Sequence, residues 1–242
     1  MRIAIQPSLK TERLSICLRS ENTSMSAIEN GNTAAKVPGL FLHKAVAYDL
    51  GVRLLTFGRE RALRQAILDR ARLQPGESVL DVGCGTGSLA LEAKRRVGPA
   101  GAVRGIDGSP EMIARAAKKA RKTRLEIVFG NAPAQALPFA DSRFDVAFST
   151  LMFHHLPRSS REQCAREMRR VVRPGGRVLV VDFGRSTRKK PAGLLGHLHR
   201  RGGVDPNEIV AHLEGAGLKI VECGDMGFMD LRFALAAVPG TA

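Results

Sequence analysis

At residues 79–87 the chain reads VLDVGCGTG, a short apolar run that carries one acid and leads into three glycines at alternate positions. The residues that follow, 88–96, have a helical pattern, so the glycines occupy a strand-to-helix turn. Glycine tolerates positive φ and, without a Cβ, lets a ligand approach the backbone. The first amides of the next helix have no partner within the helix and face the same place. The segment therefore predicts a binding turn, although a tight structural connection would use the same glycines.

Strand and helix patterns alternate around this turn. Strands are expected at 78–82, 102–106, 125–129, 146–150 and 177–182, with two more in the tail at 219–223 and 230–238. Helices are expected at 60–73, 88–97, 110–122 and 159–172, and a further helix begins after Asp205. Such alternation predicts an α/β protein with a doubly wound, Rossmann-like sheet, mostly parallel with an antiparallel C-terminal strand. Ligands bind such sheets at the carboxyl ends of the strands.

Three helix starts carry capping signals. Ser109 directly precedes Pro110, and Asp205 directly precedes Pro206, which predicts side-chain N-caps followed by proline in the first turn. Ser159 and Glu162 have the spacing of a capping box, so that helix is expected to begin at Ser159.

Composition limits the class of protein. The chain has 242 residues, 44% of them hydrophobic, which is enough for one substantial core. No stretch approaches the roughly 18 apolar residues of a membrane span. The four cysteines show no metal-ligand spacing, so no metal site or disulfide framework is expected, and their usage fits a reducing, cytoplasmic compartment. Residues 1–36 are polar and without periodicity, so we expect a disordered N-terminal extension; Met25 as the true start is an equally plain interpretation.

The net charge of +15 raises the question of a polyanionic partner. Much of it lies at the ends of expected helices, as in Lys94-Arg95-Arg96, where cations complement the helix dipole. A solvated basic surface is therefore one interpretation and a dedicated polyanion site the other. The segment 185–201 keeps the second open because it carries six Lys and Arg residues and no acid, which suits an anionic small molecule or an anionic membrane surface.

Two polar residues follow neighbouring strands at the edge where ligands bind. Asp107 closes the second strand, where an acid can accept hydrogen bonds from both hydroxyls of a ribose. Asn131 follows the third strand, and its amide offers the donor and acceptor that an adenine edge requires. Asn131 could instead simply form a turn after Gly130.

Taken together, these motifs resemble those of class I S-adenosylmethionine-dependent methyltransferases, in the broad group that includes the ubiquinone/menaquinone C-methyltransferases. The matching segments are VLDVGCGTG at 79–87, GIDGSPEM at 105–112, GNAPAQALPF at 130–139, FDVAFS at 144–149 and RPGGRVLVVDF at 173–183. The resemblance implies S-adenosyl-L-methionine as cofactor. A nicotinamide dehydrogenase fits less well, because its GxGxxG pattern would need glycine where Ser88 stands.

The resemblance also implies a role for each matched position. The residues fall into four groups: Asp81, Gly83, Gly85 and Gly87 toward the methionine end, Asp107 at the ribose, Gly108, Met112, Asn131 and Ala132 at the adenine, and Ser149 with Thr150 beneath the sulfonium. Many relatives carry Asp where this chain has Asn131. By the same resemblance, residues 37–74 form an N-terminal helical cap, in which Tyr48 would line the site or only pack, and residues 75–242 form the methyltransferase domain.

Methyl transfer needs alignment of the acceptor, exclusion of water and, where the acceptor loses a proton, a base. His154 and His155 follow the fourth strand, and His154 is the candidate base; a histidine that only packs there is the alternative. Tyr48 is the second candidate catalytic residue. The chain has Met152-Phe153-His154 where the quinone enzymes carry an Arg-Asn-Val sequence, which argues against a quinone substrate. We therefore expect a small-molecule acceptor, anionic or lipophilic, with an RNA-directed methyltransferase or a non-catalytic cofactor-binding protein as alternatives.

Overall fold

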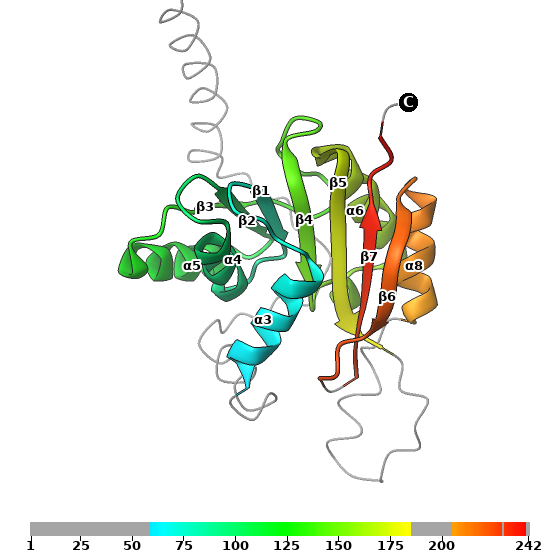
Figure 1. Cartoon of the computed structure of the whole chain (residues 1–242), viewed down its shortest axis with the longest axis horizontal. Coiled ribbons are helices and arrows are strands. Elements are labelled where there is room, and N and C mark those ends of the chain that lie inside the picture. Colours follow the sequence, from blue (N-terminus) through cyan, green and yellow to red (C-terminus); the bar gives the residue numbers. More distant parts are fainter. Residues whose placement is uncertain (1–58, 185–204, 229, 241–242) are drawn as a thin grey trace, which may run out of the picture. The chain divides into compact units, whose positions relative to one another are not determined.

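The computed structural model describes residues 59–184, 205–228 and 230–240, which form seven strands and five α-helices in alternation (Figure 1). The strands are β1 (Ser78–Val82), β2 (Ala102–Asp107), β3 (Val128–Asn131), β4 (Phe144–Thr150), β5 (Val172–Phe183), β6 (Lys219–Asp225) and β7 (Leu231–Ala237). The helices are α3 (Glu60–Arg70), α4 (Ser88–Val97), α5 (Pro110–Thr123), α6 (Arg158–Val171) and α8 (Pro206–Gly215), with a short 3-10 turn, η1 (Phe153–His155), after β4.

All seven strands form one sheet in the order β3-β2-β1-β4-β5-β7-β6. The first five pair in parallel, whereas β7 lies between β5 and β6 and is antiparallel to both. This arrangement confirms the predicted doubly wound sheet with its antiparallel C-terminal strand. The chain builds β1, β2 and β3 outward in one direction and then returns to β4 on the other side of β1. The carboxyl ends of β1 and β4 therefore flank the point at which such sheets bind ligands.

Alternate residues of each strand face two separate cores. Leu80 and Val82 of β1 belong to a core that is closed by α6 and α8, whereas Val79 belongs to the core beneath α3 and α4. Because side chains alternate along a strand, Asp81 faces the same side as Val79, toward α3 and α4. Figure 1 shows α3 crossing in front of the sheet.

Two predicted strand starts differ from the structure by three residues or more. Strand β3 begins at Val128 instead of residue 125, because Arg124 takes a left-handed conformation and the Leu125 amide donates to the Ala120 carbonyl, which extends the end of α5. Strand β5 begins at Val172, because Val172 already pairs with Phe144.

The predicted capping box at Ser159 is wrong. Helix α6 begins at Arg158, and its N-cap is Pro157, whose side chain makes no capping hydrogen bond. The Pro157 carbonyl instead accepts from the Arg161 amide at 3.0 Å, so the first turn closes before Ser159 could act as a cap. The other two caps are confirmed: Ser109 accepts from the Met112 amide, and Asp205 accepts from the Asn207 amide.

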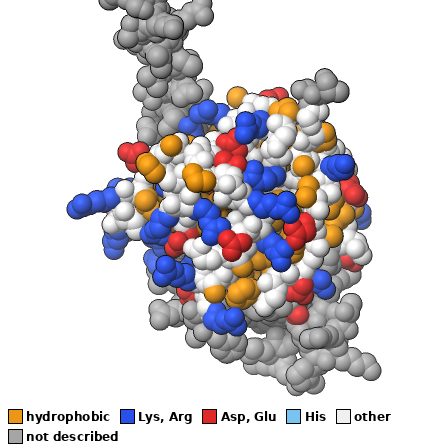
Figure 2. Space-filling view, viewed as in Figure 1, with side chains coloured by type: hydrophobic (Ala, Val, Ile, Leu, Met, Phe, Trp, Pro, Cys, Tyr) orange, Lys and Arg blue, Asp and Glu red, His pale blue; other side chains and the backbone are white. Residues whose placement is uncertain are grey.

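Basic side chains on the described surface lie interspersed with acidic ones, as Figure 2 shows for the face in view. Several arginines form ion pairs between distant elements: Glu222 of β6 pairs with both Arg70 and Arg72, and Arg177 pairs with Glu77. None of the described helices is long and apolar enough to cross a membrane. The expected extension 1–36, Tyr48 with most of the expected cap, and the basic segment 185–201 lie outside the described residues, apart from residues 59–74 of the cap.

Candidate functional site

The glycine turn after β1 has the geometry that its sequence predicts. Gly83, Gly85 and Gly87 have φ values of +76°, +52° and +76°. The amides of Gly83 and Cys84 both donate to the Ile106 carbonyl, at 2.9 and 2.8 Å, which fastens the turn to β2. Gly87 is the N-cap of α4 and has no side chain to cap the helix, so no side chain at the N-cap pairs with the first amides of α4, which lie next to the turn.

Asp107 joins this turn to the start of α5. Its Oδ2 accepts from the Gly85 amide at 2.8 Å, and its Oδ1 accepts from the Ser109 amide at 2.9 Å. Burial raises the pKa of Asp107, and these two amides oppose that shift because they favour the charged form. A carboxylate oxygen can accept more than one hydrogen bond, so both oxygens retain acceptor capacity for ribose hydroxyls.

Asp81 is the most unusual acid of the site. Its side chain is buried, with only 1% of the residue exposed, and neither carboxylate oxygen has a hydrogen-bond partner in the described structure. Burial, and secondarily the charge of Asp107, raise the pKa of Asp81 well above the ordinary value; the nearby Ala90 amide, the smallest of the three influences, lowers it. Buried polar atoms are nearly always paired, so an unpaired carboxylate indicates a missing cationic or hydrogen-bonding partner.

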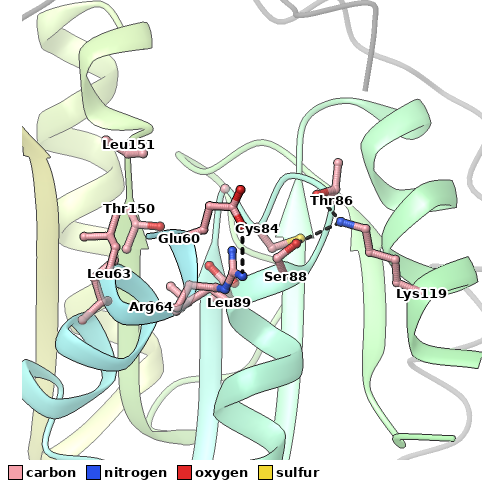
Figure 3. Close-up of a pocket in the computed structure, with 13 residues that line it drawn as sticks. Glu60, Leu63, Arg64, Cys84, Thr86, Ser88, Leu89, Lys119, Thr150 and Leu151 are labelled. Carbon is pink, nitrogen blue, oxygen red and sulfur yellow. Dashed lines mark hydrogen bonds and ion pairs between the residues drawn. The ribbon is translucent and has the colours of Figure 1, made fainter. Parts of the chain in front are cut away.

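A cavity of about 290 Å³ lies beside Asp81, between the glycine turn, α3 and the end of β4 (Figure 3). Its lining residues are Glu60, Leu63, Arg64, Ile67, Asp81, Gly83, Cys84, Thr86, Ser88, Leu89, Lys119, Thr150 and Leu151. Sequence reasoning found Asp81, Gly83 and Thr150 but missed the polar groups of α3 and α5. The available signal was weak: Glu60 and Arg64 are four residues apart, beside the apolar face of a helix that directly precedes the turn.

The residues expected at the adenine lie outside this cavity, next to Asp107. The Asn131 side chain donates its Nδ2 hydrogen to the Asp107 carbonyl at 2.8 Å, and the Ala132 amide donates to the same oxygen at 3.2 Å. Met112 and Ala132 are buried, and Gly108 lies between Asp107 and the Ser109 cap. Asn131 therefore fixes the end of β3 against β2 with its side-chain nitrogen, and its side-chain oxygen can still accept a hydrogen bond.

Ser149 and Thr150 face opposite sides of β4. Ser149 is fully buried, and its hydroxyl has no hydrogen-bond partner in the described structure, whereas Thr150 lines the cavity. The alternation of side chains along the strand accounts for the difference. Of the two, Thr150 is the residue in direct contact with the cavity.

His154 is held by a buried carboxylate at the end of β5. Its Nδ1 lies 2.6 Å from Oδ1 of Asp182, and its backbone amide donates to Oδ2 at 3.0 Å. Asp182 is fully buried and also accepts from the Phe183 amide at 2.7 Å. A carboxylate has no hydrogen to donate, so in this pair Nδ1 of His154 carries the hydrogen, and Nε2 is the nitrogen left with a lone pair. Burial, then the neighbouring His154, lower the pKa of His155, whose ring lies 3.8 Å from that of His154 between centroids.

A family model described as a methyltransferase domain matches residues 79–176, which run from the glycine turn into β5. A demethylmenaquinone methyltransferase of Thermus thermophilus is 38% identical over 161 residues, 66% of this chain and 70% of the relative. The chain belongs to the S-adenosylmethionine-dependent methyltransferases. The resemblance to the ubiquinone/menaquinone C-methyltransferase group is thereby confirmed.

Two further proteins are similar to this methyltransferase. The ubiquinone/menaquinone biosynthesis C-methyltransferase UbiE of Bdellovibrio bacteriovorus is 36% identical over 148 residues, 61% of this chain, and the match spans less than two thirds (62%) of that relative. The crystal structure of a SAM-dependent methyltransferase from Aquifex aeolicus superposes with a TM-score of 0.63 at 25% identity, covering 80% of this chain and 96% of that one.

The residues of the site fit S-adenosylmethionine, the cofactor of this family. The unpaired carboxylate of Asp81 suits an ammonium group, and Asp107 offers acceptors for ribose hydroxyls one strand away. The glycines between these acids leave the backbone open to a ligand. Asp81 is thus complementary to the amino acid end of the cofactor, and Asp107 is complementary to its ribose.

Replacing Asp107 by Ala should weaken cofactor binding about 10- to 100-fold. The change removes an acceptor for the ribose and the two hydrogen bonds that hold Gly85 and Ser109, and hydrogen bonds to charged groups contribute about 1.5–3 kcal/mol. Calorimetric titration with S-adenosylhomocysteine measures the change. Lys122→Ala at the end of α5 is the matched surface control. Equal affinity for wild type and Asp107→Ala would contradict the role of Asp107.

Proposed function

We propose that this protein transfers a methyl group from S-adenosylmethionine to a small lipophilic acceptor in the cytoplasm. When bound, the cofactor supplies a methyl group already activated by its sulfonium. The chain's own contribution is to bind the amino acid end of the cofactor through Asp81 and its ribose through Asp107, to exclude water and to position the acceptor. The observation that carries the proposal is the buried, unpaired Asp81 carboxylate beside the cavity, in a chain of this family.

We also propose that His154 accepts the proton that the acceptor loses. Asp182 acts as a positioning residue: it fixes the ring through Nδ1 and so presents Nε2 as the basic nitrogen. His155 lies against the same ring, and burial lowers its pKa, so it stays neutral at pH 7 and adds no competing positive charge. Tyr48, the other predicted catalytic residue, stays a prediction.

The acceptor class follows from this chemistry and from the relatives. An acceptor with an acidic hydroxyl or carbon needs a base, whereas a simple amine does not. The Thermus and Bdellovibrio relatives are named for quinone substrates, which are lipophilic and, in the reduced form, acidic. This chain departs from the quinone enzymes at Met152-Phe153-His154, so we propose a lipophilic hydroxylated acceptor and leave the quinone head group as one member of that class.

The experiment offers S-adenosylmethionine with a panel of lipophilic quinols and phenols and measures S-adenosylhomocysteine formation. His154→Gln should lower kcat for the best acceptor about 10²-fold, and Asp182→Asn should lower kcat by a smaller factor and change its pH profile. His212→Gln is the matched control, because His212 is a buried histidine of α8 whose ring lies near Glu208 of the same helix and Glu162 of α6.

Binding of S-adenosylhomocysteine should stay within about twofold of wild type in His154→Gln, because the ring is not part of the cofactor cavity. Unchanged turnover in His154→Gln would rule out its role as base. Absence of turnover with every member of the panel would rule out the proposed acceptor class.

A further inference from the structure

The cavity beside the glycine turn contains a second unpaired polar group, of opposite charge to Asp81. The Nε of Arg64 is buried and has no hydrogen-bond partner in the described structure. Its guanidinium reaches Glu60 only through Nη2, at 3.8 Å, which is an ion pair without hydrogen-bond geometry. Figure 3 shows the Arg64 side chain rising from α3 between Glu60 and Leu89 in the cavity wall.

The fold holds Arg64 in this place. Leu63 and Ile67 of α3 are buried in the core beneath it, which fixes the face that the helix turns toward the sheet. At the end of the helix, Arg177 of β5 donates to the Ala71 carbonyl at 2.8 Å. Asp81 faces the same side of the sheet. A carboxylate from β1 and a guanidinium from α3 therefore line one cavity without bonding to each other.

An α-amino acid end would satisfy both groups. It carries an ammonium and a carboxylate on one carbon, and these match an unpaired carboxylate and an unpaired guanidinium, whose forked donors suit a carboxylate. The other cation of the cavity is already engaged: Lys119 donates to the hydroxyls of Thr86 and Ser88, at 2.8 and 2.9 Å.

We propose that Arg64 binds the α-carboxylate of the methionine end of the cofactor and that Glu60 orients the guanidinium. The inference rests on the proposed methyl donor and adds a carboxylate-binding residue on α3 to the acids of β1 and β2. Binding is selective as a consequence. The cavity binds the amino acid end, so the protein distinguishes the intact cofactor from nucleosides that share only its adenosine and sulfur.

The test compares two probes, S-adenosylhomocysteine and 5′-methylthioadenosine, which lacks the amino acid end. In calorimetric titrations, Arg64→Met should weaken S-adenosylhomocysteine binding about 10- to 100-fold and change methylthioadenosine binding by less than about twofold. Methionine keeps the apolar stem of the side chain, so packing is retained. The affinity of Arg64→Lys for S-adenosylhomocysteine should lie between those of wild type and Arg64→Met, because lysine keeps the charge and loses the forked pair of donors. Arg121→Met, at an exposed position of α5, is the matched control for the loss of one positive charge.

Three results would overturn the proposal in distinguishable ways. If Arg64→Met bound S-adenosylhomocysteine as tightly as wild type does, the carboxylate-binding role of Arg64 would be ruled out and the proposed function would stand. An equal loss for both probes would mean that the substitution damages the cavity as a whole, and Arg64→Lys with wild-type affinity for both would exclude recognition by the guanidinium fork. If wild type bound neither probe, the methyl donor itself would be wrong, and the proposed function would fall with it.

Discussion

Replacing Asp81 by Asn is expected to weaken S-adenosylmethionine binding about 10²- to 10⁴-fold while making the cofactor-free protein more stable. The loss follows because the ammonium of the cofactor would be left buried without its countercharge, and breaking a buried pair in this way costs about 3–5 kcal/mol. The gain follows because Asp81 is buried with both oxygens unpaired, so its charge opposes folding when no cofactor is bound.

The pH dependence of unfolding distinguishes this charge effect from a change in packing. The pKa of Asp81 is raised in the folded state, so between its ordinary value of 3.8 and the raised value the folded protein binds more protons than the unfolded one. The free energy of unfolding of the wild type therefore falls as pH rises through that window. Asp81→Asn should lack this contribution, as measured by urea unfolding from pH 4 upward without cofactor.

Asp145 provides the matched control for Asp81→Asn. It is also a strand carboxylate, but it accepts from the Ser78 amide at 2.6 Å and pairs with Arg173. Asp145→Asn should therefore lower stability and leave cofactor affinity unchanged. A cofactor-free Asp81→Asn protein less stable than wild type at neutral pH would show that the carboxylate has a partner after all.

Replacing Gly87 by Ala should destabilise the protein by about 2–5 kcal/mol and remove cofactor binding under conditions where the fold survives. Two costs add: a left-handed backbone at φ +76° costs an L-residue about 1–2 kcal/mol, and overpacking costs about 1–3 kcal/mol. The new Cβ would lie 2.8 Å from the Ala116 Cβ and 2.9 Å from the Phe129 ring. Relief requires α5 or β3 to move away from the glycine turn.

Gly76 separates the two costs of the Gly87 substitution. It has φ +84° in the turn that the Glu77 amide closes on the Gln74 carbonyl, and a Cβ there would meet nothing within 4 Å. Gly76→Ala should therefore cost only the backbone term, about 1–2 kcal/mol, and leave cofactor binding intact. Denaturant midpoints of both variants measure the difference. Equal destabilisation by the two substitutions would show that packing of α5 on the turn contributes nothing.

Much of the fold could be predicted because its signals are local. The glycines at 83, 85 and 87 mark the turn, and Ser109-Pro110 and Asp205-Pro206 mark two helix starts. The boundaries that were wrong depend on contacts between distant segments. Val172 joins β5 only because Phe144 is there to pair with it, and the start of α6 depends on a backbone hydrogen bond from Arg161 to Pro157 that no side-chain pattern records.

The acids of the site could be predicted because they stand at the ends of strands, next to recognisable turns. The partners of these acids could not. In the sequence Asp182 is simply an acid at the end of an apolar strand. Only the fold places its Oδ1 2.6 Å from Nδ1 of His154, which lies 28 positions earlier in the chain. Arg64 is one of many arginines, and only the packing of α3 over the sheet separates it from those on the surface.

The position of β7 governs the order in which the sheet can be completed during synthesis. β6 is made first, yet in the described structure it pairs only with β7, and the outer edge of β5 is likewise covered only by β7. Until residues 231–237 leave the ribosome, the growing chain carries an unpaired edge on β5 and an unattached strand β6, both of which can pair wrongly. A nascent chain stalled before β7 is thus the form of this protein with the greatest need for a chaperone.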